Sequence, residues 1–179
     1  MEKRPSDSGS HREDSELTGG NDMDSINRVI KNGVETEPVY KKKRGIVLLR
    51  RTDDLIFVSG HGPEDQITGV PLYRGRIGED LTIEEGYAAA RECAVIILGA
   101  LKDTLGSLDK VKRIIKAFGL VNCGKDFTDI EKVFDGFSDT VADVLEERGY
   151  HTRTVMGTRN LPNQNIPVEI EVIVEVEET

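Results

Sequence analysis

The chain has 179 residues, of which 33 are acidic and 24 are basic, and its formal net charge is -9 at pH 7. Such an acidic chain would repel phosphate backbones and anionic membrane surfaces, so nucleic acid is not an expected partner. The sequence has neither the about 20 consecutive apolar residues of a membrane-spanning helix nor the apolar segment of a secretory signal, and it therefore predicts a cytoplasmic protein.

The chain divides by composition into a tail and one domain. Residues 1–22 are mostly Ser, Asp, Glu, Gly, Arg and Lys, which bury too little apolar surface to offset the entropy of ordering. A disordered tail is therefore predicted for residues 1–22. Residues 23–179 are enough for a single domain with a substantial core, and a short helix from Asp24 or Ser25 to about Gly33 is expected at its start.

The hydrophobic pattern predicts two strands, a helix, a strand, a second helix and two final strands. The expected segments are, in that order, residues 45–50, 55–59, 82–106, 111–121, 126–149, 153–161 and 167–176. The first helix opens with a capping box formed by Thr82 and Glu85 and ends at Gly106, whereas the second is capped by Asp126 and ends at Gly149. This order predicts an α+β fold in which two helices pack on one face of a mixed sheet.

The last two extended runs carry the strongest functional signal. Every second residue from Val168 to Val176 is apolar, and the residues between them are Glu169, Glu171, Ile173 and Glu175, as expected for a strand that is buried on one side only. If this run pairs antiparallel with the preceding one across the turn at Asn160 to Asn165, Arg153 and Glu169 lie at nearly equal distances from the turn. A cation and a carboxylate that converge on one small site would suit a small carboxylate substrate that is attacked by water.

The second face of the predicted sheet also needs a covering. Two helices cover one face only, so the face that carries Glu169, Glu171, Ile173 and Glu175 must meet water or other copies of the chain. A small closed oligomer with sites in the clefts between protomers would allow both.

Simpler interpretations exist for several of these residues. Arg153 could pair with an acidic neighbour, and Glu169 could be a solvated surface carboxylate. His61 and His151 are interpreted as exposed polar residues, and His151 is expected to point to the face of the strand opposite to Arg153. The two cysteines, Cys93 and Cys123, fit no metal-ligand spacing and are interpreted as buried reduced thiols.

A set of short motifs connects the chain to a known family. The motifs are Val58-Ser59-Gly60, Leu105 to Val111, Arg153-Thr154, Leu161-Pro162 and Val168-Glu169-Ile170-Glu171. Over roughly residues 38–176 they resemble the Rid proteins, which are reactive intermediate (enamine/imine) deaminases with a fold like that of trimeric chorismate mutase. The segments Ser59 to Pro63, Gly78 to Thr82 and Gly136 to Ser138 look like those of a divergent branch of that family.

The resemblance implies a homotrimeric enzyme that hydrolyses small carboxylate-bearing enamines or imines of the 2-aminoacrylate type to 2-keto acids and ammonia. No metal or organic cofactor is implied. Arg153 would bind the substrate carboxylate and Glu169 would hold and activate the water. Gly60 would let its loop approach the ligand, and the backbone near Val155 would add a polar contact. Tyr40 is the candidate for the catalytic tyrosine of the family, although it lies several residues further upstream.

Other functions are compatible with the same residues. A non-enzymatic module that binds a small metabolite such as a keto acid would keep Arg153 and lack turnover. An endoribonuclease is a further alternative, which the net charge of -9 disfavours. Rearrangement of chorismate is suggested by analogy of fold alone. In addition, an asparagine that the family often shows on its second helix is replaced here by Phe134 or Asp135.

Overall fold

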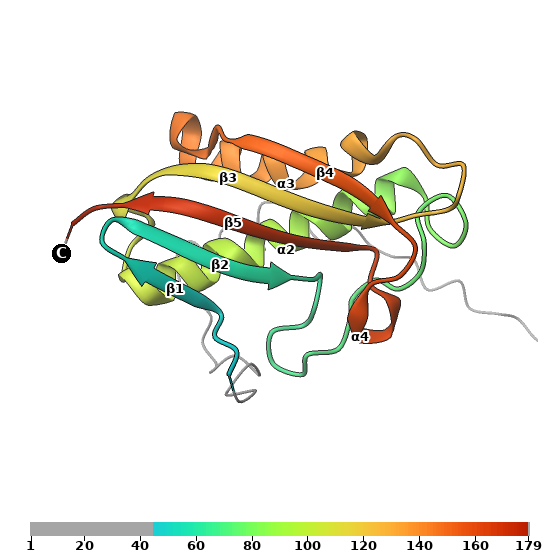
Figure 1. Ribbon diagram of the computed structural model, residues 1–179, viewed down its shortest axis with the longest axis horizontal. Coiled ribbons are helices and arrows are strands. Elements are labelled where there is room, and N and C mark those ends of the chain that lie inside the picture. The colour runs from blue at the N-terminus through green and yellow to red at the C-terminus, as the bar shows by residue number, and fades with distance from the viewer. Residues whose placement is uncertain (1–44, 179) are drawn as a thin grey trace, which may run out of the picture.

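The computed structural model describes residues 45–178, in which two long helices cover one face of a five-stranded sheet (Figure 1). The predicted tail over residues 1–22, the predicted helix at Asp24 to Gly33 and the candidate tyrosine Tyr40 lie outside this range. Within the range, no helix is long and apolar enough to cross a membrane.

The order of the elements confirms the predicted α+β fold. The elements are β1 (Leu49–Thr52), β2 (Leu55–His61), α2 (Ile83–Leu105), β3 (Val111–Asn122), α3 (Ile130–Leu145), β4 (Thr152–Thr158), the short α4 (Pro162–Asn165) and β5 (Val168–Val176), with 3-10 turns at Leu108–Lys110 and Glu146–Gly149. The capping box before α2 is present: the Glu85 backbone N–H donates to Thr82 Oγ1 at 3.1 Å, and the Thr82 N–H donates to Glu85 Oε2 at 2.8 Å. These two bonds fix the start of α2 where it was expected.

The second helix is shorter than predicted. It begins at Ile130, and Asp126 does not cap it. Phe127 packs against the core instead, and its backbone N–H donates to the Gly124 carbonyl at 3.2 Å. The residues after β3 therefore form a turn before the helix begins. At its other end, α3 stops at Leu145 and a 3-10 turn continues the chain.

The strand order, β1-β2-β5-β3-β4, corrects the predicted pairing of the last two strands. Arg153 in β4 pairs with Ala117 in β3, and these strands are parallel. On its other side β3 is antiparallel to β5, where Ala117 faces Val172 and Leu120 faces Glu169. β3 therefore lies between β4 and β5 (Figure 1), and the two do not form a hairpin. The reason is that α3 returns the chain to the start of β3, so β4 joins β3 in a parallel β-α-β unit.

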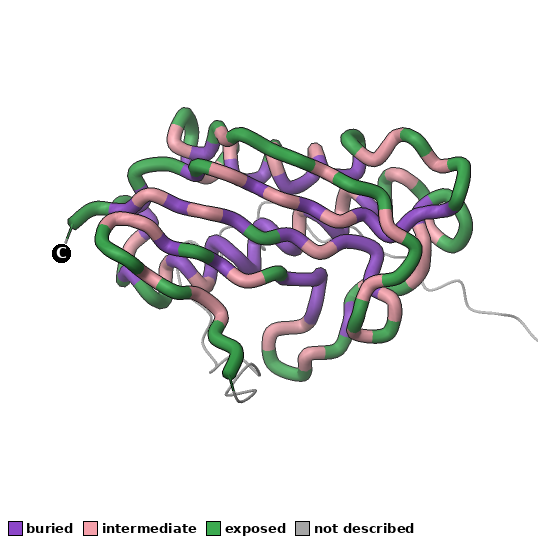
Figure 2. Tube along the Cα trace, viewed as in Figure 1, coloured by how far each residue is buried: buried purple, intermediate pink, exposed green. Residues whose placement is uncertain are grey.

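The core lies between the sheet and the two helices. Figure 2 shows buried segments alternating with less buried ones along the central strands. In β5 the buried residues are Val168, Ile170, Val172, Val174 and Val176, whereas Glu169, Glu171, Ile173 and Glu175 are partly or fully exposed. This alternation confirms the predicted half-buried final strand.

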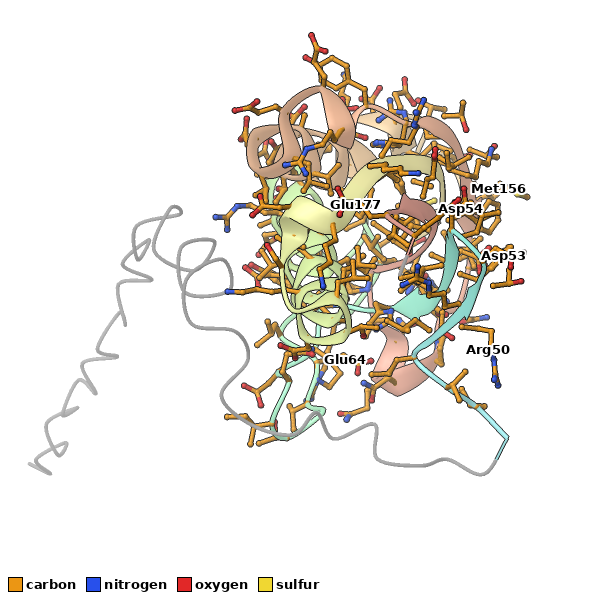
Figure 3. All side chains as sticks on the ribbon, turned by 90° about the vertical axis from the view of Figure 1, so that its left-hand side faces the viewer. Arg50, Asp53, Asp54, Glu64, Met156 and Glu177 are labelled. Carbon is orange, nitrogen blue, oxygen red and sulfur yellow. The ribbon has the colours of Figure 1, made fainter. Side chains whose placement is uncertain are left out.

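The opposite face of the sheet, which we call the open face, carries apolar side chains. Phe57 on β2 is 44% exposed and Met156 on β4 is 52% exposed. Phe118, Leu120 and Ile173 are partly exposed on the strands between them. Figure 3 shows Met156 on the side of the sheet away from α2. In a single chain this apolar surface meets solvent.

Candidate functional site

Arg153 lies on the helix side of the edge strand β4. Its ladder neighbour Ala117 is fully buried under the helices, and laterally paired residues share one face of a sheet. Arg153 Nη1 donates to Asp135 Oδ1 at 2.6 Å and to Ser138 Oγ at 3.2 Å. The guanidinium carbon lies 5.6 Å from the centre of the Phe134 ring, within the range of a cation–π contact. Three side chains of α3 therefore hold the cation.

Phe134 can support Arg153 because a glycine lies under its ring. A Cβ atom on Gly119 in β3 would overlap the Phe134 ring, so only glycine permits this approach of α3 to the sheet. Phe134 is fully buried, and its ring packs 5.4 Å from that of Phe137. The arginine therefore rests on a close-packed part of the core.

The position of His151 corrects the sequence prediction. His151 and Arg153 are two residues apart in an extended segment, so they share a face and do not oppose each other. His151 Nδ1 lies 2.7 Å from the Gly149 carbonyl, which can only accept a hydrogen bond, so Nδ1 carries the proton. Nε2 then accepts from the Ser138 hydroxyl at 3.2 Å. Burial lowers the pKa of His151 below its ordinary value, and the Arg153 cation lowers it further.

Glu169 lies on the open face, at the end of the sheet where β2 stops. Its carboxylate packs directly on Gly60, because a Cβ atom on Gly60 would overlap Glu169 Oε1. The glycine therefore provides the space in which this carboxylate lies. Burial raises the pKa of Glu169 above its ordinary value, and the nearby carboxylates of Glu64 and Glu171 raise it further. This group holds its proton more tightly than a solvated glutamate does.

Within one chain Arg153 and Glu169 do not share a site, which corrects the prediction that they converge. Through Ala117, Arg153 is level with Val172, three residues along β5 from Glu169. With about 4.8 Å between strands and about 3.3 Å per residue, their backbones are about 14 Å apart. Their side chains leave opposite faces of the sheet. The acidic neighbour that the simpler interpretation proposed for Arg153 is Asp135.

His61 is also placed differently from the prediction, because it is only 2% exposed. Its Nδ1 atom lies 2.6 Å from the Ser59 carbonyl, and burial lowers the pKa of the ring below its ordinary value. A pocket of about 220 Å³ between β1 and α2 is lined by His61, Leu48, Leu49, Gln66, Ala100, Asp103 and Thr104. None of these residues belongs to the surroundings of Arg153.

The remaining candidates add little to the site. Val155 is partly buried and packs against the core from β4, two residues after Arg153. Cys93 and Cys123 are free and buried, as predicted, and burial raises the pKa of both thiols. Among residues 45–178, no group of three His, Cys, Asp or Glu side chains is arranged to hold a metal ion.

Sequence reasoning missed the contacts of Asp135 and Ser138 with Arg153. A signal was available, because residues three apart on a helix share a face, and Asp135 and Ser138 have this spacing. Which strand this face meets depends on the strand order, and the predicted order placed Arg153 beside Glu169.

Comparison with known proteins identifies the family. Residues 52–173 match the family described as "YjgF/chorismate_mutase-like, putative endoribonuclease". Protein TCP17 of Trypanosoma cruzi is 38% identical over 122 residues, which are 68% of this chain and 74% of that protein. The crystal structure of Atu1372, a protein with unknown function from Agrobacterium tumefaciens, is 34% identical with a TM-score of 0.73, over 87% of this chain and 95% of that one. A structure from Shewanella oneidensis, described as a "putative endoribonuclease", is 26% identical with a TM-score of 0.73, over 85% of this chain and 99% of that one. This chain therefore belongs to the YjgF/chorismate-mutase-like family, which is the Rid family that its motifs resemble.

Proposed function

We propose that the protein is a hydrolytic deaminase of small carboxylate-bearing enamines and imines of the 2-aminoacrylate type. Its family supports a role with small molecules. The observation that carries the proposal is the anchored cation: α3 holds Arg153 through Nη1 alone among the described residues, so the Nε–Nη2 edge of the guanidinium is open. That edge has the fork geometry that binds a carboxylate through two parallel hydrogen bonds.

The chemistry assigns one task to each charged group. The enamine tautomerises to an imine, water adds to the imine carbon, and ammonia leaves to give a 2-keto acid. Arg153 holds the substrate carboxylate, and Glu169 accepts a proton from the attacking water. The raised pKa of Glu169 makes it a stronger base than a solvated glutamate. General base catalysis of this kind contributes about 10²- to 10⁴-fold in rate. A protonated imine is itself electrophilic, so this scheme uses no metal.

We further propose that the site is completed between copies of the chain in a homotrimer. Arg153 and Glu169 lie on opposite faces in one chain, so one substrate can contact both only if they come from different copies. Arg153 is on an edge strand, where a second copy can approach it. The exposed Phe57 and Met156 of the open face supply an apolar surface for such a contact.

A turnover assay tests the residue assignment. 2-Aminoacrylate is generated enzymatically, and pyruvate release is measured above the spontaneous rate. We expect the wild type to accelerate release and both Arg153→Ala and Glu169→Ala to lose about 10²-fold or more. Matched controls are Arg113→Ala, which removes an arginine paired with Glu175 at 2.9 Å, and Glu177→Ala beyond the end of β5. An active wild type whose activity survives both site replacements would show that the assignment is wrong.

One observation favours a second candidate, the binding module without turnover. Arg153 is already paired with Asp135 at 2.6 Å and is separated from Glu169 in the single chain. A module of this kind would bind pyruvate in an Arg153-dependent manner and would not accelerate its release in the turnover assay. Calorimetric titration of pyruvate into the wild type and Arg153→Ala measures this binding, and the turnover assay separates the two candidates: Arg153-dependent binding without acceleration supports the module.

The family description also contains the word endoribonuclease. The net charge of -9 is unfavourable for RNA binding, which usually depends on basic surfaces. RNA cleavage that survives in Arg153→Ala and Glu169→Ala would indicate a different site from the one proposed here.

A further inference from the structure

Arg153 and Asp135 form an ion pair in which each partner keeps one side open. Among residues 45–178, both hydrogen bonds from Arg153 leave Nη1, and the one that Asp135 accepts ends on Oδ1. The Nε–Nη2 edge of the guanidinium and the Oδ2 atom of the carboxylate therefore have no partner in the described part of the chain. The two side chains are 32% and 42% exposed, so a small solute can reach both.

This pair is better fixed than an ordinary surface ion pair, in which two long side chains lose entropy and gain little energy. The Phe134 ring supports the guanidinium from below, at 5.6 Å. The Ser138 hydroxyl, which accepts a hydrogen bond from Nη1, is oriented by His151. Asp135 belongs to the same helix as Phe134 and Ser138. The positive and negative groups are thus held side by side on one support.

We propose that Arg153 and Asp135 together recognise a zwitterionic head group, a carboxylate next to a cationic nitrogen, as in a protonated α-imino acid or an α-amino acid. The ligand carboxylate takes the Nε–Nη2 edge of Arg153 in bidentate geometry, and the N–H of its cationic nitrogen donates to Asp135 Oδ2. The inference rests on the proposed function and narrows its substrate class to the protonated imine.

The same arrangement distinguishes substrate from product. Loss of ammonia leaves a 2-keto acid, which keeps the carboxylate for Arg153 but has no cationic nitrogen for Asp135. The product then places a carbonyl oxygen near the Oδ2 atom of Asp135, and two hydrogen-bond acceptors in contact repel each other. The keto acid is therefore the weaker ligand, which favours its release.

A pair of stable probes with equal carbon number tests the inference. L-Alanine carries both charges, whereas propionate carries the carboxylate only, and each is titrated into the full chain by calorimetry or by NMR. We expect the wild type to bind L-alanine more tightly than propionate. Asp135→Asn should weaken L-alanine about tenfold or more, as expected for the loss of a charge-assisted hydrogen bond. It should leave propionate unchanged or more tightly bound, because a competing anion is removed.

Two further variants complete the test: one examines the carboxylate site of the proposed function, and the other is a control for Asp135→Asn. Arg153→Gln should weaken both probes, and no effect on either probe would contradict the carboxylate site itself. The matched control is Asp139→Asn, one turn further along α3, where Asp139 accepts from the Tyr87 hydroxyl at 2.9 Å. It should change neither affinity.

The inference is overturned if Asp135→Asn weakens both probes equally, which would mean that Asp135 only orients Arg153. It is also overturned if the variant leaves L-alanine unaffected, or if the wild type binds L-alanine no more tightly than propionate or binds neither. Asp135→Ser is a second neutral replacement, and circular dichroism verifies that each variant is folded.

Discussion

The two faces of the sheet hold their charged groups in different ways. On the helix side, Arg153 is a permanent cation that three side chains of one helix position. On the open face, Glu169 is a carboxyl group whose pKa is raised by burial and which lies in the space left by Gly60. The first arrangement suits binding and the second suits proton transfer. Because they have separate supports, a change at one should leave the other intact.

The largest effect is expected from combining defects on the two faces. Each variant alone, Arg153→Ala or Glu169→Gln, should have a turnover rate about 10²-fold or more below that of the wild type. If each site takes Arg153 from one copy and Glu169 from another, hybrid trimers that contain both variants should regain roughly a third of wild-type turnover, because one of their three sites has both residues intact. Hybrids are prepared by co-expression with two affinity tags, and pyruvate release is measured.

The matched control for the hybrids is each variant carried through the same procedure alone. Hybrids that remain as inactive as their parents would show that the two residues are not shared between copies. The comparison between the two faces would then describe two unrelated features of the fold.

A smaller effect is expected from filling the space beside Glu169. A Cβ atom at position 60 would overlap Glu169 Oε1, so Gly60→Ala should displace the carboxylate and lower turnover by about 10²-fold or less. Binding of propionate, which depends on Arg153, should not change. In the Glu169→Gln background, Gly60→Ala should cause no further loss, because both act through one group. Additive losses would contradict this.

The smallest expected effect concerns stability and pH. The folded protein binds the Glu169 proton more tightly than the unfolded chain does, so this group lowers stability as pH rises from its unfolded pKa through the raised folded pKa. Glu169→Gln should therefore be slightly more stable than wild type at pH 7, by less than about 1 kcal/mol because solvent screens a partly exposed group. The difference should vanish at acidic pH, below the unfolded pKa. Thermal unfolding at several pH values measures the stability difference between Glu169→Gln and the wild type, with Glu177→Gln as the control. A stability gain that is the same at every pH would show that the raised pKa of Glu169 is not its cause.

Local signals in the sequence were sufficient for the order of the elements and for some of their boundaries. The capping box at Thr82 and the alternation over residues 168–176 depend on neighbours in the sequence, and both were predicted correctly. The start of the second helix at Ile130 was missed because Phe127 packs against the core first. That contact is tertiary, and a capping residue such as Asp126 cannot reveal it.

The candidate site was harder to predict than the elements because it depends on the strand order. An alternating pattern shows that β5 is half buried, but it does not show which strand lies beside it. The insertion of β3 between β4 and β5 follows from the route of α3, and it separates Arg153 from Glu169. The same route brings Asp135 and Ser138 to Arg153. The residue types indicated a site, but their partners required the topology.

Among residues 45–178, the hydrogen bonds and the ring contact of the Arg153 side chain are all made with α3, so the cation depends on that helix for its position. Local opening of α3 would therefore release the guanidinium while the pairing of β2, β5 and β3 persists. Mild heating or a low concentration of denaturant should therefore abolish binding of a carboxylate to Arg153 before the protein unfolds globally. Hydrogen exchange of the α3 amides would report whether this carboxylate site is occupied more directly than exchange of the β4 amides.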